Sequence, residues 1–234
     1  MSSKSNGFLD NRHPILSRDL LGRLYALNLD YLELVIAERA ASRTRGLAYL
    51  PERVMDALAT CSAQSRQALA STAFSLYSLG FEDQHFWRSA AYVGQHPIDA
   101  RYGGLSALVV QTSFCEIALL HAWHVAVTQP LAARVVYGMS TPVINRLCLM
   151  QLWQLKRIAA DYPGLLTPRW SSNPCFWPDM IKFASEGDWG RLATVQRLGH
   201  QLIAVELQES AAPESAARQR HRNLLQQRLQ RAKR

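Results

Sequence analysis

The chain has 234 residues, of which 48% are apolar and 19% charged, so it can bury a substantial core, and disorder of the whole chain is excluded. No stretch approaches the roughly eighteen uncharged apolar residues of a membrane span, and no apolar segment follows the N-terminal charges, so neither a span nor a secretory signal is expected. The formal net charge is +8. These features predict a cytoplasmic protein.

The first predicted element is a helix over residues 20–41 that is apolar on two sides. One stripe has the three-to-four spacing of a helix face and consists of Leu20, Leu24, Leu27, Tyr31, Leu34 and Val35. Leu29, Leu32 and Ile36 form a second stripe, and the amide of Asn28 interrupts the run. The second stripe is expected either to be covered by another protein surface or to be buried centrally in a monomer.

Helical periodicity continues through most of the remaining chain. The spacing predicts helices over residues 52–58, 64–79, 105–127 and 142–162, with another opening at Pro130. Gly80 is expected to end the second of these helices, and the acids Glu82 and Asp83 are expected to cap the next one. No alternating strand pattern of any length is found. The predicted fold class is all-α.

Two segments about ninety residues apart resemble each other, which indicates an internal repeat. Residues 69–90 and 158–184 both run from a helix into an aromatic residue, then a polar turn, then a Phe-Trp pair. The pairs are Phe86-Trp87 and Phe176-Trp177, and the second turn has one extra residue. Each pair is interpreted as a core wedge beneath the turn, in preference to a stacking platform for bases.

The repeat predicts two tandem, divergent helical units packed together. The expected divisions are an N-terminal segment over residues 1–17, a first unit over 18–100, a second unit over 101–209 and a basic tail over 210–234.

The basic charge is concentrated in this tail, because residues 1–217 carry only +1 of the net +8. The seven tail cations are Arg218, Arg220, Arg222, Arg228, Arg231, Lys233 and Arg234. Leu224, Leu225 and Leu229 give the tail a short apolar ridge, so it is expected to be disordered, or helical when bound. A polycationic end of this kind is a candidate arm for nucleic-acid phosphates. The alternatives are a solvated tail, an anionic membrane surface or an acidic protein partner.

Catalytic and metal-binding patterns are weak. Cys61, Cys115, Cys148 and Cys175 are scattered and form no CxxC pair. His121 and His124 share a predicted helix face, but no carboxylate or cysteine stands near them at ligand spacing, so we expect no metal. Glycine-rich phosphate loops, GxSxG and HExxH are missing from the sequence. We therefore expect a protein that is not an enzyme and needs no cofactor.

The sequence LLGRLYALNLDYLELVIAERA, with its order Leu-Tyr-x-x-Asn-Leu-x-Tyr-Leu-x-Leu, resembles the first helix of FlhD, a subunit of the flagellar master regulator. The similarity continues through LASTAFSLYSLGF and covers residues 20–87, about a third of the chain. The resemblance implies an all-helical bacterial subunit that dimerises through this helix. It also implies assembly with a second subunit, FlhC, into a complex that binds DNA and activates transcription.

The resemblance implies a candidate subunit interface, whereas the candidate DNA-binding residues come from the distribution of basic charge. The candidate subunit interface consists of Tyr25, Asn28, Leu29, Leu32, Ile36 and Tyr77. Asn28 would act as a polar pin for the register of the pairing. The candidate DNA-binding residues are the seven tail cations together with Arg88 and Arg101. For these two arginines, an ordinary surface ion pair is the plainer interpretation.

The sequence departs from the FlhD pattern in three ways. Tyr77 stands where the family has a cysteine that bridges its dimer, and the segment YVGQHPIDARYGG does not match the DNA-contacting segment. The chain also carries a second unit, so it could form internally the pairing that FlhD forms between two chains. The partners expected are an FlhC-like subunit or another protein, DNA bound by the complex, and a second copy if the pseudo-dimer is not internal.

Two alternatives remain open at this point. The first is an adaptor or antagonist that does not bind DNA and captures a regulator subunit through FlhD-type helices. The second is an unrelated helical protein whose tail binds RNA or a membrane.

Overall fold

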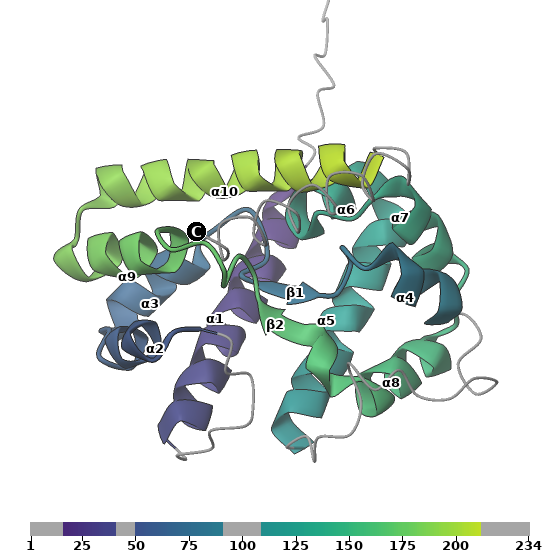
Figure 1. Ribbon diagram of the computed structural model, residues 1–234, viewed down its shortest axis with the longest axis horizontal. Helices are drawn as coiled ribbons and strands as arrows, with labels where there is room; N and C mark the ends of the chain where they lie inside the picture. The colour runs from purple at the N-terminus through teal and green to yellow at the C-terminus, as the bar shows by residue number, and fades with distance from the viewer. Residues whose placement is uncertain (1–15, 41–49, 91–108, 212–234) are drawn as a thin grey trace, which may run out of the picture.

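Two groups of helices flank a short two-stranded sheet at the centre of the molecule (Figure 1). The computed structural model describes residues 16–40, 50–90 and 109–211. The elements of the first half are α1 (Arg18–Ala40), α2 (Glu52–Ala59), α3 (Ala63–Ala70), β1 (Tyr77–Leu79) and α4 (Gln84–Ser89). Those of the second half are α5 (Val109–Thr128), α6 (Pro130–Tyr137), α7 (Thr141–Cys148), α8 (Leu152–Asp161), η2 (Pro163–Leu165), β2 (Leu166–Pro168), α9 (Phe176–Glu186) and α10 (Trp189–Ala211). The expected all-α class is confirmed.

The two halves repeat the same order of elements at a constant spacing. Helices α7 and α8 and strand β2 each begin 89 residues after their counterparts α2, α3 and β1. The Phe-Trp helices α4 and α9 follow the strands, and an aspartate or asparagine three residues before each phenylalanine accepts its backbone N–H. The backbone N–H of Phe86 donates to Asp83 Oδ1 at 2.8 Å, and that of Phe176 donates to Asn173 Oδ1 at 3.0 Å.

The halves are related by a local twofold axis at the sheet. The strands pair antiparallel, with Ser78 opposite Thr167, its own equivalent 89 residues later. The flanking pairs are reciprocal, because Tyr77 lies opposite Pro168 and Leu79 opposite Leu166. The helices follow the same relation: α4 packs on α7 of the other half, and α9 packs on α2. The Phe-Trp helix of each unit therefore packs on a helix of the other unit.

The paired tryptophans anchor these exchanged helices. Trp87 and Trp177 are fully buried. The indole of Trp87 donates to the Gly80 carbonyl at 2.9 Å, and the indole of Trp177 donates to the Arg169 carbonyl at 2.7 Å. The prediction that the Phe-Trp pairs act as core wedges agrees with this burial, and their N–H groups additionally hold the turn that follows each strand.

Helices α6 and α10 have no counterpart in the described part of the first half. Figure 1 shows α10 crossing the molecule from α9 toward α6, and α10 packs on both of these helices. Helix α10 also lies close to the segment before β1. At Gly199 of α10, an added Cβ would lie 2.6 Å from Cε1 of the buried Phe74. A glycine in this helix therefore permits the contact with the segment before β1.

Two expected helices are wrong in extent. The helix predicted over 64–79 ends at Ala70, and its last residues form an extended segment and strand β1. The side chain of Asn28 binds the backbone of that segment, so tertiary contacts replace the helical hydrogen bonds. The helix predicted over 142–162 is two helices, since Leu149 to Gln151 form a corner and the Gln154 side chain accepts the Gln151 N–H at 2.8 Å.

The short strands were not predicted either. Each has three residues, too few to show alternation, and they pair only because the fold brings the two halves together. Among the helices that the structure describes, none is both long and apolar enough to cross a membrane.

Candidate functional site

The amide of Asn28 is the polar centre of the first half. Its side chain is fully buried in α1 and makes four hydrogen bonds to the segment that follows α3. Nδ2 donates to the carbonyls of Ala70 at 3.1 Å and Phe74 at 2.9 Å, and to Thr72 Oγ1 at 3.0 Å. Oδ1 accepts the N–H of Leu76 at 2.9 Å. The amide thus fixes the backbone that leads into the sheet.

A cluster of aromatic rings fills the contact between the two halves. The ring of Tyr77 lies 5.4 Å from that of Tyr31, 5.3 Å from Phe114 and 6.4 Å from Tyr137, measured between centroids. Tyr31 also lies 5.9 Å from Phe114. Burial raises the pKa of Tyr31, Tyr77 and Tyr137, so all three phenols stay neutral.

The candidate interface residues lie largely inside the chain. Asn28, Leu32 and Tyr77 are fully buried, and Tyr77 contacts rings from the second half. Leu29 and Ile36 are partly buried against the core, and Tyr25 is partly buried as well. The second apolar stripe of α1, formed by Leu29, Leu32 and Ile36, is therefore covered mainly by residues of this chain.

Most candidate DNA-binding residues lie outside the described residues. These are Arg101 and the tail cations Arg218, Arg220, Arg222, Arg228, Arg231, Lys233 and Arg234. Arg88 is described: it is exposed on α4, where its Nη2 lies 3.3 Å from Gln84 Oε1, and its backbone carbonyl accepts a hydrogen bond from Arg146 at 2.9 Å.

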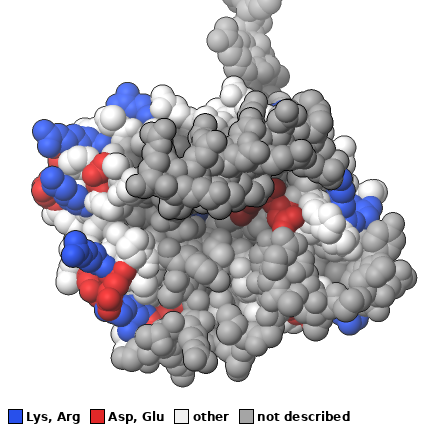
Figure 2. All heavy atoms as spheres, viewed as in Figure 1, with Lys and Arg blue, Asp and Glu red and all other residues white. Residues whose placement is uncertain are grey.

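The described surface mixes charges of both signs. Figure 2 shows basic and acidic side chains interleaved along the edge of the molecule where Figure 1 places α2, α9 and the start of α10. In this region Arg39 binds Glu52 at 2.9 Å and Asp56 at 2.8 Å, and Arg191 lies 3.5 Å from Asp188. On this face, no uniform basic patch is visible among the residues drawn in colour.

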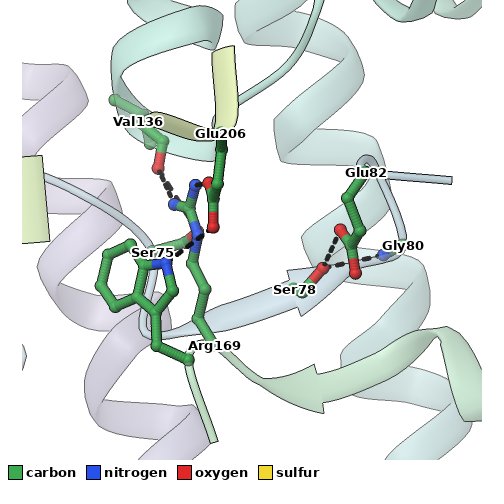
Figure 3. A network of polar contacts seen from close by, with 8 residues as sticks. Ser75, Ser78, Gly80, Glu82, Val136, Arg169 and Glu206 are labelled. Atoms are coloured by element: carbon green, nitrogen blue, oxygen red, sulfur yellow. Dashed lines mark hydrogen bonds and ion pairs between the residues drawn. The ribbon is translucent and has the colours of Figure 1, made fainter. Parts of the chain in front are cut away.

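A buried ion pair beyond the end of β2 was not expected from the sequence. Arg169 is 5% exposed, and its Nη2 donates to Glu206 Oε2 of α10 at 2.6 Å (Figure 3). Its Nη1 donates to the Val136 carbonyl at 3.2 Å, and its guanidinium stands 4.7 Å from the Trp170 ring centroid. The indole N–H of Trp170 donates to Glu206 Oε1 at 2.6 Å.

This network joins three segments that are distant in sequence. Glu206 on α10 holds both Arg169 and Trp170, and the Val136 carbonyl near the end of α6 also accepts the Ser75 N–H at 3.0 Å. Trp170 adopts a positive φ of 52°, a strained value for a non-glycine residue that these contacts maintain. Nothing in the local sequence pairs Arg169 with Glu206, since α10 carries a second acid, Glu209, and the two partners lie 37 residues apart.

The histidine pair on α5 does not form a metal site with other described residues, since no group of three or more His, Cys, Asp and Glu side chains is placed to hold an ion there. His121 Nδ1 lies 2.6 Å from the Tyr137 hydroxyl. Burial lowers the pKa of His121 to about 4, and the charges of His124 and Arg23 act in the same direction. The ring is therefore neutral, and its Nδ1 shares a hydrogen bond with the Tyr137 hydroxyl.

The buried thiol of Cys115 is unsuited to nucleophilic chemistry. Burial raises its pKa to about 12, so the thiolate is not populated near neutral pH. Cys61 is also buried, with its Sγ 3.4 Å from the Ser185 hydroxyl. These cysteines occupy the interior as small apolar side chains.

Comparisons with known proteins identify no match for this chain. No protein-family model matches the chain, and neither the curated proteins nor the solved structures contain a match.

Proposed function

We propose that the protein is a bacterial transcription regulator subunit, a single-chain counterpart of an FlhD-type dimer, that acts in a complex with an FlhC-like subunit and DNA. The observation that carries this proposal is the reciprocal exchange of α4 and α9 around the twofold axis between β1 and β2. Two copies of one unit that pairs with itself would be arranged in this way. A symmetric protein surface suits a partner or a DNA site with related symmetry.

In this proposal, the basic side chains of the tail contact phosphates, and sequence is read by the partner or by the assembled complex. The charge distribution supports such a division, because residues 1–217 carry a net charge of only +1. The aromatic contact between the halves replaces the cysteine bridge of the FlhD family, with Tyr77 at its centre.

A second candidate is an adaptor that binds a regulator subunit without touching DNA. The interleaved charges along the edge formed by α2, α9 and the start of α10 favour this alternative, since they offer phosphates no continuous basic track there.

Titration of duplex DNA at several salt concentrations distinguishes the two functions. The full chain is expected to bind, alone or with an FlhC subunit added, and the logarithm of affinity should fall linearly with the logarithm of salt. Deletion of residues 218–234 is expected to reduce both the affinity and this slope. If neither the chain nor its mixture with FlhC shifts DNA, the regulator proposal fails and the adaptor remains.

A further inference from the structure

Three large apolar side chains are exposed together where α7 meets α8. Leu149, Leu152 and Trp153 are 76%, 49% and 53% exposed, and we call this group the α7/α8 corner. Leu149 directly follows α7, and Leu152 and Trp153 begin α8, so the three lie within five consecutive residues. The Trp153 N–H donates to Gln151 Oε1 at 2.6 Å, so its polar atom is satisfied while the ring stays accessible.

The first half supplies a matched comparison, because its α2/α3 corner has the same backbone. The N–H of Met150 donates to the Leu147 carbonyl at 3.0 Å, and the equivalent N–H of Cys61 donates to the Leu58 carbonyl at 3.1 Å. At the positions 89 residues before the apolar side chains, this corner carries Thr60, Ala63 and Gln64. The turn therefore does not require bulky apolar residues.

The two halves differ in exposed apolar residues over the whole described surface as well. All the exposed large hydrophobic residues there belong to the second half, between Val110 and Val205. Among these, the α7/α8 corner is the closest grouping in sequence. Because the same backbone also accommodates small or polar residues, large apolar side chains that are exposed here are expected to serve a contact with another molecule.

The charge around the corner indicates the chemistry of that molecule. Helices α4, α7 and α8 each carry a net charge of +1, and α5, which packs on both α7 and α8, carries −1, so the four helices together carry +2. The counterparts of α4, α7 and α8, which are α9, α2 and α3, carry −1, −1 and +1. On α8, Lys156 and Arg157 follow the corner and remain more than half exposed, although they bind Glu116 at 3.1 Å and Asp161 at 3.2 Å.

We propose that the α7/α8 corner is a docking surface for an acidic amphipathic helix of another protein. Leu149, Leu152 and Trp153 would receive apolar side chains from successive turns of that helix, and its acidic residues would face the basic surroundings. Contact between two copies through this corner would oppose like charges. Trp153 alone could stack on a base, whereas the two leucines beside it match apolar side chains, which favours a protein helix over nucleic acid. This inference goes beyond the proposed regulator function, because a chain that bound no DNA would present the same corner.

The test uses two fluorescent peptides of roughly eighteen residues, long enough to form a helix. Both carry leucine and phenylalanine on one face, and the remaining positions are glutamate in one peptide and lysine in the other. The full chain is compared with the triple variant L149T/L152A/W153Q, which transplants the residues of the α2/α3 corner. The control variant L131Q changes an equally exposed leucine on α6.

The full chain and L131Q are expected to bind the acidic peptide with a dissociation constant of about micromolar order, and the triple variant at least about tenfold more weakly. The lysine peptide should also bind at least about tenfold more weakly than the acidic one. Circular dichroism checks that the triple variant is folded. The proposal is overturned if the acidic peptide does not bind, if both peptides bind equally, or if the triple variant binds as the full chain does. Self-association or oligonucleotide binding that only the triple variant loses would assign the corner to those ligands instead.

Discussion

At the scale of single residues, a few polar side chains buried among apolar ones decide the path of the chain. Asn28 binds three backbone groups and one hydroxyl between the end of α3 and β1. The sequence marked Asn28 as an interruption of an apolar run. The identity of its partners, 42 to 48 residues away, came only from the fold.

Replacement of this amide is expected to be costly. N28A leaves the buried N–H of Leu76 without its partner, and the carbonyls of Ala70 and Phe74 each lose one of two donors, since both also accept from Thr72. The free energy of unfolding should fall by about 3 to 5 kcal/mol. Urea denaturation followed by circular dichroism measures this change. N145A, which removes an exposed amide on α7, serves as the control and should change stability by less than about 0.5 kcal/mol. Equal stability of the two variants would contradict the role given to Asn28.

His121 on α5 makes the free energy of unfolding depend on pH. The folded chain holds the pKa of His121 at about 4, below its usual value of 6.5, because the ring is buried. Between about pH 6.5 and pH 4 the unfolded chain therefore binds a proton that the folded chain does not. The free energy of unfolding should fall over this range by ~2 kcal/mol, a figure reduced to allow for the exposed part of the ring.

The variant H121Q isolates this contribution, since an amide can accept from Tyr137 without titrating. Urea denaturation at about pH 7 and about pH 4.5 should show a smaller loss of stability for H121Q than for the unmodified chain. H85Q, which removes an exposed imidazole on α4, is the control and should keep the original slope. An unchanged slope in H121Q would show that other groups cause the acid sensitivity.

At the scale of elements, the exchanged helices α4 and α9 link the two halves. Each is short and is held by a buried tryptophan whose N–H binds a carbonyl beyond the strand of its own unit. The repeated Phe-Trp pair revealed this equivalence in the sequence. The packing of each pair on the opposite half could not be read there, because an identical pattern would serve a unit that packs only on itself.

Replacement of either tryptophan should therefore lower the free energy of unfolding by a similar amount. W87F and W177F each remove an indole donor from the core; the Gly80 carbonyl keeps the Asp83 N–H at 3.0 Å, whereas the Arg169 carbonyl loses the donor that Trp177 supplies. Each variant is expected to lose about 2 to 3 kcal/mol of unfolding free energy. Chemical denaturation measures both losses, with W153F as an exposed control that should change little. A large loss in only one variant would mean that the halves do not depend on each other symmetrically.

At the scale of the whole molecule, the two halves form one interdependent body. They share the sheet, exchange α4 and α9, and bury the rings of Tyr31, Tyr77, Phe114 and Tyr137 between them. Helix α10 crosses this assembly, and the pair of Arg169 with Glu206 fixes it near α6.

The first unit by itself should not be a folded monomer. Residues 16–90 alone would leave Tyr77 without Phe114 and Tyr137, and β1 without its partner strand. This fragment is expected either to form a homodimer that reproduces the twofold contact or to remain unfolded. Light scattering after size-exclusion chromatography, together with near-ultraviolet circular dichroism, tests this expectation against the full chain. A folded monomeric fragment would refute the interdependence of the halves.

The sequence by itself determined the helical class, the repeat of about ninety residues, the cap at Asp83 and the wedge role of the Phe-Trp pairs, because these depend on local spacing and chemistry. Tertiary structure decided where the predicted helices over 64–79 and 142–162 break, since Asn28 captures one segment and a corner divides the other. It also decided that the second stripe of α1 is covered mainly within the chain and that Arg169 is buried against Glu206. These outcomes depend on groups far apart in sequence, and only the folded chain brings them into contact.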